Sequence, residues 1–255
     1  MKAADDAATL SPAEANVADS GLKSMVPLGD RPFLDYILSS LADAGCARIC
    51  LVIGPEHGAI RERYTKEAQP RRFAIDFAIQ EKPLGTGNAV LAASAFVGED
   101  EFLMTNSDNY YPVDVLRTLV RLGRPGTVLF GPDTLAAKSN IEPARILAFA
   151  LGKVGVDGCL DALVEKPDAD EVAAMGKDRL VSMNCWRFPS AIMAACAELK
   201  PSKRGELELT DAIVKTIANG VRYKVGTSRD GVLDLSKRGD IPALRGRLTG
   251  VTVAL

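Results

Sequence analysis

The sequence predicts an α/β protein built around an open, mostly parallel, doubly wound sheet. Two observations support this class: apolar runs of strand length alternate with segments of helical apolar spacing, and glycine or proline bounds most of the runs. At 255 residues, 47% of them hydrophobic, the chain is long enough for one large α/β domain. We therefore expect a single domain over residues 1–255, with ligands at the carboxyl ends of its strands.

The expected elements follow one another along the chain. Residues 1–20 are rich in Ala, Asp and Ser and should form a loop or weak helix that adds little to the core. The expected helices are 33–44, 57–68, the segment that follows Gly87, 113–123, 189–199, 204–220 and 240–250. The expected strands are 47–54, 72–80, 101–108, 127–133, 145–152, 158–168, 179–188, 221–226 and 231–236.

Composition argues against several classes of partner. The net charge of -2 and the scattered Lys and Arg residues disfavour a nucleic-acid surface and an anionic-membrane surface. His57 is the only histidine, so histidine triads and histidine-based metal sites have little material. No apolar run reaches membrane-spanning length, and the start lacks the apolar segment of a signal peptide. We expect a cytoplasmic protein, for which a homo-oligomer is an open alternative.

The cysteines have no C-x-x-C spacing, and most of them lie in apolar surroundings. This pattern predicts buried free thiols in a reducing compartment, in preference to a disulfide or a zinc site. The five positions are Cys46, Cys50, Cys159, Cys185 and Cys196.

Residues 80–93, QEKPLGTGNAVLAA, form a Gly-Thr-Gly turn that opens into a small-residue helix. Gly85 and Gly87 can take backbone angles closed to other residues, and they allow a planar group to approach the main chain. The first N–H groups of the helix point outward, which suits polar or anionic ligand atoms. The alternative is a tight turn whose helix packs on the sheet without binding anything.

Two aspartates follow apolar runs. Asp108 ends the strand segment EFLMTNSD, and Asp234 lies in GVLDLS. A carboxylate at a strand end beside a glycine-rich loop is a natural ligand for Mg²⁺, which binds through one or two carboxylates plus substrate phosphates. Alternatively, Asp108 caps the next helix or turn and Asp234 is a turn residue.

Glu165 and Lys166 stand side by side before Pro167. A carboxylate accepts hydrogen bonds from sugar hydroxyls and an ammonium binds phosphate oxygens, so the pair can hold a sugar phosphate. The alternative is a solvated charged turn, and Lys23 is likewise either a phosphate ligand or a surface lysine. GTGNAV lacks the third glycine of a dinucleotide fingerprint and no P-loop occurs, so dehydrogenase and P-loop functions are disfavoured.

The order of these segments resembles that of the sugar-1-phosphate nucleotidylyltransferases, which join a nucleoside triphosphate and a sugar phosphate to give a nucleotide sugar and pyrophosphate. KSMVPLGDRPFLDYIL resembles the family's lysine-proline segment, QEKPLGTGNAV its base-recognition turn, and TNSDNYYP its metal-aspartate strand end. VEKP resembles the sugar-binding segment, RGELELTDAI the late helix, and GVLDLSKRGDI the segment with the second metal aspartate. The resemblance implies a nucleotide-diphospho-sugar transferase fold, which is Rossmann-like, and an enzyme of the nucleotidyltransferase class.

For the nucleotide, the resemblance implies that Gln80, Gly85 and Thr86 face the base and that Lys23 binds phosphate oxygens. The compact Leu-Gly-Thr-Gly turn resembles that of pyrimidine-selective members, which favours UTP or dTTP as the substrate. We therefore expect a nucleoside triphosphate to lie against the turn.

For the sugar phosphate, the resemblance implies that Glu165 accepts hydrogen bonds from sugar hydroxyls, Lys166 binds the phosphate, and Asn184 lines the same pocket. Asp108 and Asp234 would hold Mg²⁺ between the triphosphate and a hexose 1-phosphate. In-line attack on the α-phosphorus requires positioning and charge neutralisation, with little need for a protein nucleophile.

The sequence departs from the family at one place. Family members begin with a strand and a glycine-rich loop, roughly L-A-A-G-x-G-T-R, which wraps the triphosphate and supplies an arginine. No such segment precedes Lys23, so one central strand position is expected to be empty. Three alternatives follow: a sequence that starts after this loop, a nucleotide or sugar-phosphate binding or regulatory domain without turnover, or a cytidylyltransferase with a different phosphate acceptor.

Overall fold

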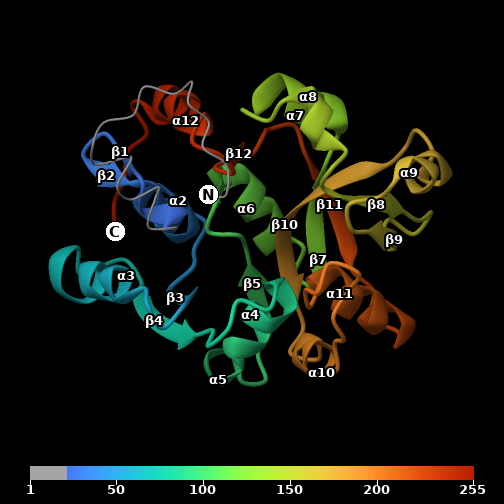
Figure 1. The fold of residues 1–255 in the computed structure, drawn as a ribbon, viewed down its shortest axis with the longest axis horizontal. Coiled ribbons are helices and arrows are strands. Elements are labelled where there is room, and N and C mark those ends of the chain that lie inside the picture. The colour runs from blue at the N-terminus through green and yellow to red at the C-terminus, as the bar shows by residue number, and fades with distance from the viewer. Residues whose placement is uncertain (1–21) are drawn as a thin grey trace.

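A computed structural model describes residues 22–255, so the expectation for residues 1–20 lies outside the described part of the chain (Figure 1). The helices are η1 (Lys23–Met25), α2 (Phe33–Asp43), α3 (Gly58–Glu62), η2 (Arg63–Glu67), α4 (Thr86–Ala92), α5 (Ser94–Val97), α6 (Val113–Arg121), α7 (Pro132–Lys138), α8 (Pro143–Ile146), α9 (Ala169–Met175), α10 (Ile192–Ala197), α11 (Leu209–Ala218) and α12 (Asp240–Leu248). Within this part of the chain, every helix is too short or too polar to cross a membrane.

The strands form one large sheet and three small ones. They are β1 (Pro27–Leu28), β2 (Arg31–Pro32), β3 (Arg48–Ile53), β4 (Ala74–Ile79), β5 (Phe102–Met104), β6 (Asn109–Tyr110), β7 (Gly126–Phe130), β8 (Ala150–Val154), β9 (Leu160–Val164), β10 (Leu180–Phe188), β11 (Lys224–Ser228) and β12 (Leu233–Asp234). The large sheet has the order β11-β7-β10-β8-β9, and β5 pairs with the other end of β10. The expected parallel pairing occurs at β3–β4 and β7–β11, whereas β10 is antiparallel to its neighbours β5, β7 and β8.

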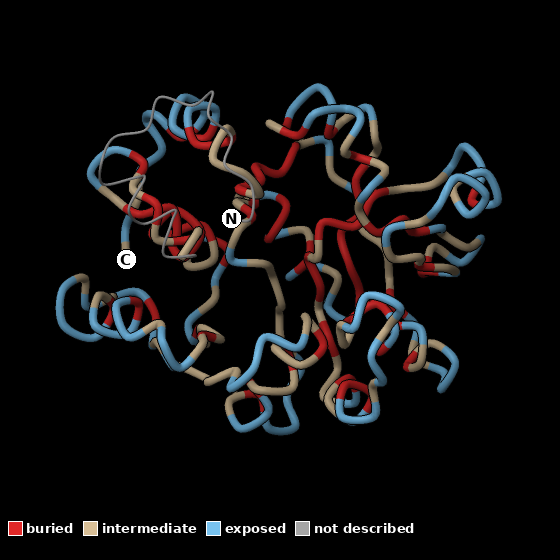
Figure 2. The backbone as a smooth tube through the Cα atoms, viewed as in Figure 1, coloured by how far each residue is buried: buried red, intermediate tan, exposed pale blue. Residues whose placement is uncertain are grey.

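Helices cover both faces of the large sheet. Successive side chains of its strands point to opposite faces, and each face packs against helices in a separate hydrophobic core. On β7, Val128 and Phe130 pack with residues of α6, while Leu129 packs on the other side with residues of α10 and α11. Trp186 of β10 is fully buried in the second of these cores. Figure 2 shows the buried strands of this sheet running between helices whose outer surfaces are exposed. This arrangement confirms the expected α/β class.

Strands β3 and β5 each have one edge without a strand partner in the described part of the chain. Strand β3 pairs only with β4, and β5 pairs only with β10. Residues of both strands line one cavity of about 760 Å³, together with apolar side chains of α2 and α4. Within the described residues this cavity lies between β3 and β5, and the expectation of an empty central strand position stays a prediction.

Several expected elements differ from those observed. The expected strand 101–108 ends at Met104, so Asp108 lies in the turn that follows it. The expected strand 127–133 ends at Phe130, because Pro132 fixes the first turn of α7. Pro143 does the same for α8, so Arg145 lies in a helix and the expected strand 145–152 begins only at Ala150. The expected helix 204–220 begins only at Leu209, because residues 203–206 form a turn and Leu207 hydrogen-bonds to the glycine turn.

The cysteines are free thiols. Cys159, Cys185 and Cys196 are buried, while Cys46 and Cys50 are partly buried. Burial raises the pKa of the Cys196 thiol to about 12, so little thiolate forms near neutral pH. The expectation of buried free thiols is confirmed for Cys159, Cys185 and Cys196, whereas Cys46 and Cys50 are free thiols that are only partly buried.

Candidate functional site

A short ladder brings Asp108 and Asp234 together from distant parts of the sequence. Strand β6 pairs antiparallel with β12, with Asn109 opposite Asp234. The Leu235 N–H donates to the Asp108 carbonyl at 2.8 Å, and Asn109 Nδ2 donates to Asp234 Oδ1 at 3.0 Å. Asp108 lies in the turn between β5 and β6, directly before this ladder, so the ladder brings the two predicted metal ligands together.

The electrostatics of Asp108 suit a cation. Burial raises the pKa of Asp108, the negative charge of Asp234 raises it further, and the positive charge of Lys23 lowers it. Two carboxylates that repel each other in a desolvated site are stabilised by a cation placed between them. Lys23 supplies part of that compensation in this structure.

The larger cavity brings together the residues predicted to bind the nucleotide. Its wall includes Lys23, Gln80, Thr86 and Asp108. Gln80 Nε2 donates to the Gly85 carbonyl at 3.1 Å and to Asn88 Oδ1 at 3.0 Å, which ties the end of β4 to the turn before α4. The predicted base-facing group is therefore one cluster.

A second cavity of about 280 Å³ brings together the residues predicted to bind the sugar phosphate. Its wall includes Asp108, Glu165, Lys166, Asn184 and Asp234. Asp108 lines both cavities, so its carboxylate stands between the two groups of residues. Eight of the nine candidate residues thus line one of these two cavities, and Gly85, which lines neither, is joined to them by the hydrogen bond from Gln80 to its carbonyl.

Comparison with known proteins shows the family. The family model for nucleotidyl transferases matches residues 16–231. The chain belongs to the nucleotidyl transferase family. It is 31% identical over 206 residues to the glucose-1-phosphate thymidylyltransferase of Streptomyces antibioticus, a match that covers 80% of this chain and 54% of the relative. It is 32% identical over 205 residues to the bifunctional protein GlmU of Methanococcus maripaludis strain C7, covering 80% of this chain and 44% of the relative. This nucleotidyl transferase therefore spans about half the length of the curated relatives it matches.

Solved structures support the fold. UDP-glucose pyrophosphorylase complexed with UDP-glucose matches with a TM-score of 0.71 at 18% identity, covering 89% of this chain and 90% of that chain. UTP-bound UGPase from Acinetobacter baumannii matches with a TM-score of 0.72 at 18% identity, covering 91% and 87%. The expected nucleotide-diphospho-sugar transferase fold is confirmed.

The smaller cavity of the nucleotidyl transferase has two residues with left-handed backbone, Lys166 (φ 43°) and Asn184 (φ 54°). Among the described non-glycine residues only Gln69 shares this conformation. Such residues cost about 1–3 kcal/mol each and persist where the surrounding structure fixes them. Asn184 lies where β10 shifts its register against β7, so a bulge holds it at the cavity wall.

The glycine turn packs against the main chain of Leu207. The Leu207 N–H donates to the Leu84 carbonyl at 2.7 Å, and the Gly87 N–H donates to the Leu207 carbonyl at 2.9 Å. A Cβ on Gly85, whose φ is 118°, would lie 2.8 Å from the Leu207 nitrogen and oxygen. The close approach that we expected from a ligand is therefore made by the protein backbone at this face of Gly85.

Gly85→Ala is expected to lower the free energy of unfolding of the nucleotidyl transferase by about 2–3 kcal/mol, because it adds this clash to a strained φ. Urea unfolding measures the change. Gly176→Ala is the matched control, since Gly176 has a φ of 76° and nothing within 4 Å of an added Cβ. A loss in Gly85→Ala no larger than the loss in Gly176→Ala would contradict the role given to Leu207.

Sequence reasoning missed four polar residues of the site. Asn109, Asn140 and Arg145 hold Asp234, and Thr210 holds Glu165. Only Asn109 had a signal, because it follows Asp108 directly in the same motif. The others come from helices or loops that sequence alone does not bring to this edge of the sheet.

Proposed function

We propose that this chain transfers a nucleotidyl group from a nucleoside triphosphate to a hexose 1-phosphate, giving a nucleotide sugar and pyrophosphate. The observation that carries the proposal is the position of Asp108, which lines both the cavity of the base-facing residues and that of the sugar-phosphate residues. We favour UTP or dTTP, because the Leu-Gly-Thr-Gly turn is compact and similar proteins include a thymidylyltransferase and a UTP--glucose-1-phosphate uridylyltransferase.

We further propose that Asp108 and Asp234 hold Mg²⁺. The donor set fits this ion, since Mg²⁺ uses one or two carboxylates and takes its other ligands from water and substrate phosphates. Residues 22–255 contain no group of three or more His, Cys, Asp or Glu side chains that could hold a metal ion. When bound, the ion neutralises negative charge on the phosphates.

In the proposed reaction, an oxygen of the sugar phosphate attacks the α-phosphorus while the bond from that phosphorus to the bridging oxygen breaks, and pyrophosphate leaves. Lys166 binds the sugar phosphate and Glu165 orients the sugar through its hydroxyls, so that the attacking oxygen faces the nucleotide. Lys23 balances charge on the triphosphate from the opposite side of Asp108.

The test is to incubate the 255-residue protein with Mg²⁺, glucose 1-phosphate and each nucleoside triphosphate in turn. Pyrophosphate is followed by a coupled assay and the nucleotide sugar by chromatography. We expect product with UTP or dTTP. Preference for a purine nucleotide would overturn the base assignment, and product from choline phosphate with CTP in place of glucose 1-phosphate would favour a cytidylyltransferase.

A second candidate function is binding without turnover. It is favoured by the side chain of Asp234, both of whose oxygens already accept hydrogen bonds, one from Asn109 and one from Arg145. Calorimetry distinguishes the two functions, because a binding domain takes up nucleotide or sugar phosphate but releases no pyrophosphate. Turnover by the 255-residue protein would exclude it.

Thr210→Val is expected to raise the KM for the hexose 1-phosphate about fivefold, with the KM for the nucleotide unchanged. Thr210 Oγ1 donates to Glu165 Oε2 at 2.8 Å, and the loss of one such bond to a charged group costs on the order of 1 kcal/mol. Thr210→Ser keeps the hydroxyl and should behave like the native protein. An equal rise in both KM values would show that Thr210 has only a structural role.

A further inference from the structure

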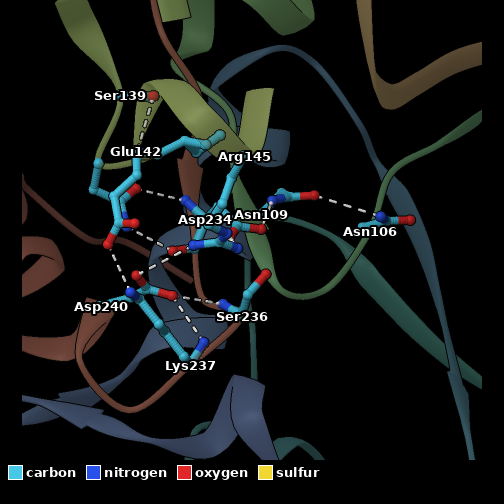
Figure 3. A network of polar contacts seen from close by, with 11 residues as sticks. Asn106, Asn109, Ser139, Glu142, Arg145, Asp234, Ser236, Lys237 and Asp240 are labelled. Carbon is cyan, nitrogen blue, oxygen red and sulfur yellow. Dashed lines mark hydrogen bonds and ion pairs between the residues drawn. The ribbon is translucent and has the colours of Figure 1, made fainter. Parts of the chain in front are cut away.

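Asp234 has a hydrogen-bond partner at each of its polar atoms (Figure 3). Oδ1 accepts from Asn109 Nδ2 at 3.0 Å, and Oδ2 accepts from Arg145 Nη2 at 3.1 Å. Its backbone N–H donates to Asn140 Oδ1 at 2.8 Å, and its carbonyl accepts from Asn140 Nδ2 at 2.7 Å. The side chain is buried, so these partners determine what else its carboxylate can bind.

Arg145 bridges two buried acids. Its Nη2 contacts Asp234, and its Nη1 lies 3.8 Å from Asp240 Oδ1. That second contact is too long for a hydrogen bond, and Nη1 is buried without a partner in the described part of the chain. The other oxygen of Asp240 accepts from the N–H groups of Ser236 and Lys237, so Asp240 is fixed by the loop after β12. The guanidinium of Arg145 is therefore held in place mainly by its hydrogen bond to Asp234. Its buried Nη1 has no hydrogen-bond acceptor in the described part of the chain, which makes the position of the guanidinium less stable.

A divalent cation and Arg145 cannot both be accommodated at Asp234 without cost. Mg²⁺ needs direct contact with a carboxylate oxygen at about 2.0–2.1 Å. One oxygen is already bonded to an amide and the other to a guanidinium, which brings a positive charge to the place where the ion would lie. In a partly buried site two cations repel each other strongly. Arg145 also lines the smaller cavity together with Asp108 and Lys166, so it has space beside the proposed sugar phosphate.

We propose that Arg145 is a built-in competitor of the divalent cation for Asp234, and that it keeps the metal affinity of the substrate-free protein low. The inference rests on the proposed metal site at Asp108 and Asp234. It assigns a role to a residue of α8, a helix that the sequence did not predict.

The test measures binding of Mn²⁺, as a probe for Mg²⁺, to the substrate-free 255-residue protein by titration calorimetry. Arg145→Gln is expected to lower the Kd for Mn²⁺ about tenfold, because it removes the competing charge. Arg145→Lys keeps a positive charge and should bind Mn²⁺ like the native protein. Arg145→Met is a second neutral variant, which decides the question if Arg145→Gln does not fold. Arg222→Gln is the control for net charge, since Arg222 is half-exposed and pairs with Asp157 away from both cavities.

The possible outcomes separate the inference from the proposed metal site. If native protein binds Mn²⁺ and Asp108→Asn does not, the proposed metal site is correct. In that case, an unchanged or weaker affinity for Mn²⁺ in the neutral Arg145 variants overturns the proposal that Arg145 competes with the cation. An equal gain in Arg222→Gln, or in Arg145→Lys, overturns it as well. If no variant binds Mn²⁺ at millimolar concentration, the competitor is overturned, because removal of Arg145 then frees no site, whereas the metal site shared with substrate phosphates is tested by pyrophosphate release in Asp108→Asn.

Discussion

Asp108→Asn is expected to lower the rate of Mg²⁺-dependent pyrophosphate release about 10²- to 10³-fold, with little change in stability. Asn has nearly the same shape but no charge, so the proposed cation would lose its best-placed protein ligand. The pKa of Asp108 is raised by burial and by Asp234, which shows that its ionised form is disfavoured when no cation is bound. Removing the charge therefore relieves repulsion in the free protein while it weakens cation binding.

The assay for Asp108→Asn follows pyrophosphate release under saturating UTP or dTTP and glucose 1-phosphate, and Mn²⁺ calorimetry gives an independent measure of metal binding. Asp114→Asn is the matched control, because Asp114 is an exposed carboxylate in the first turn of α6 that pairs only with Arg117. Asp108→Asn with more than about a tenth of native turnover and an unchanged Kd for Mn²⁺ would contradict the assignment of Asp108 as a metal ligand.

The sequence was most informative where a residue follows a strand directly. Gln80 comes directly after β4 and lines the larger cavity as expected, whereas Asp108 lines the same cavity from the turn between β5 and β6. The alternation of apolar runs and helical spacing predicted most strands, because a buried strand needs a continuous apolar run and a helix does not. This pattern locates a strand along the chain but not its end, since the strands expected at 101–108 and 127–133 end at Met104 and Phe130.

Partners that depend on tertiary contacts could not be predicted. Leu207 contacts the glycine turn through its backbone atoms. The amino-acid type at this position therefore gives no indication of the contact. Arg145 reaches Asp234 from α8, although the segment 145–152 was expected to be a strand. Thr210 has an ordinary place in the first turn of α11, and only the path of the chain brings it to Glu165.

The position of Asp108 depends on few strand partners. Strand β5 has three residues and pairs only with β10 among the described residues. Beyond β5, the chain is held by the two-residue ladder between β6 and β12 and by the bond from Leu235 to the Asp108 carbonyl. Because β12 also carries Asp234, any displacement of this ladder moves both proposed metal ligands together.

Asp35→Ala is expected to lower the free energy of unfolding by about 3–5 kcal/mol, the largest stability change that we predict. Asp35 of α2 is fully buried and accepts from Arg63 Nε at 3.2 Å, Arg63 Nη2 at 2.5 Å and the Tyr64 hydroxyl at 2.8 Å. Its removal leaves a guanidinium and a buried hydroxyl without their acceptor, which costs more than the loss of the bonds themselves. Urea unfolding followed by circular dichroism measures the change.

Two further variants show whether the cost comes from the buried partners. Asp43→Ala also removes a carboxylate from α2, but its pair with Arg72 is about one-third exposed on both sides, so a loss below about 1 kcal/mol is expected. The triple variant Asp35→Leu, Arg63→Met, Tyr64→Phe removes the orphaned groups along with the acid and should recover most of the lost stability. If Asp35→Ala lowers the free energy of unfolding no more than Asp43→Ala does, the hydrogen bonds of Asp35 to Arg63 and Tyr64 do not stabilise the packing of α2 on η2. If the triple variant is as unstable as Asp35→Ala, the loss reflects packing around α2, because the acid and both of its hydrogen-bond donors are then replaced by apolar side chains.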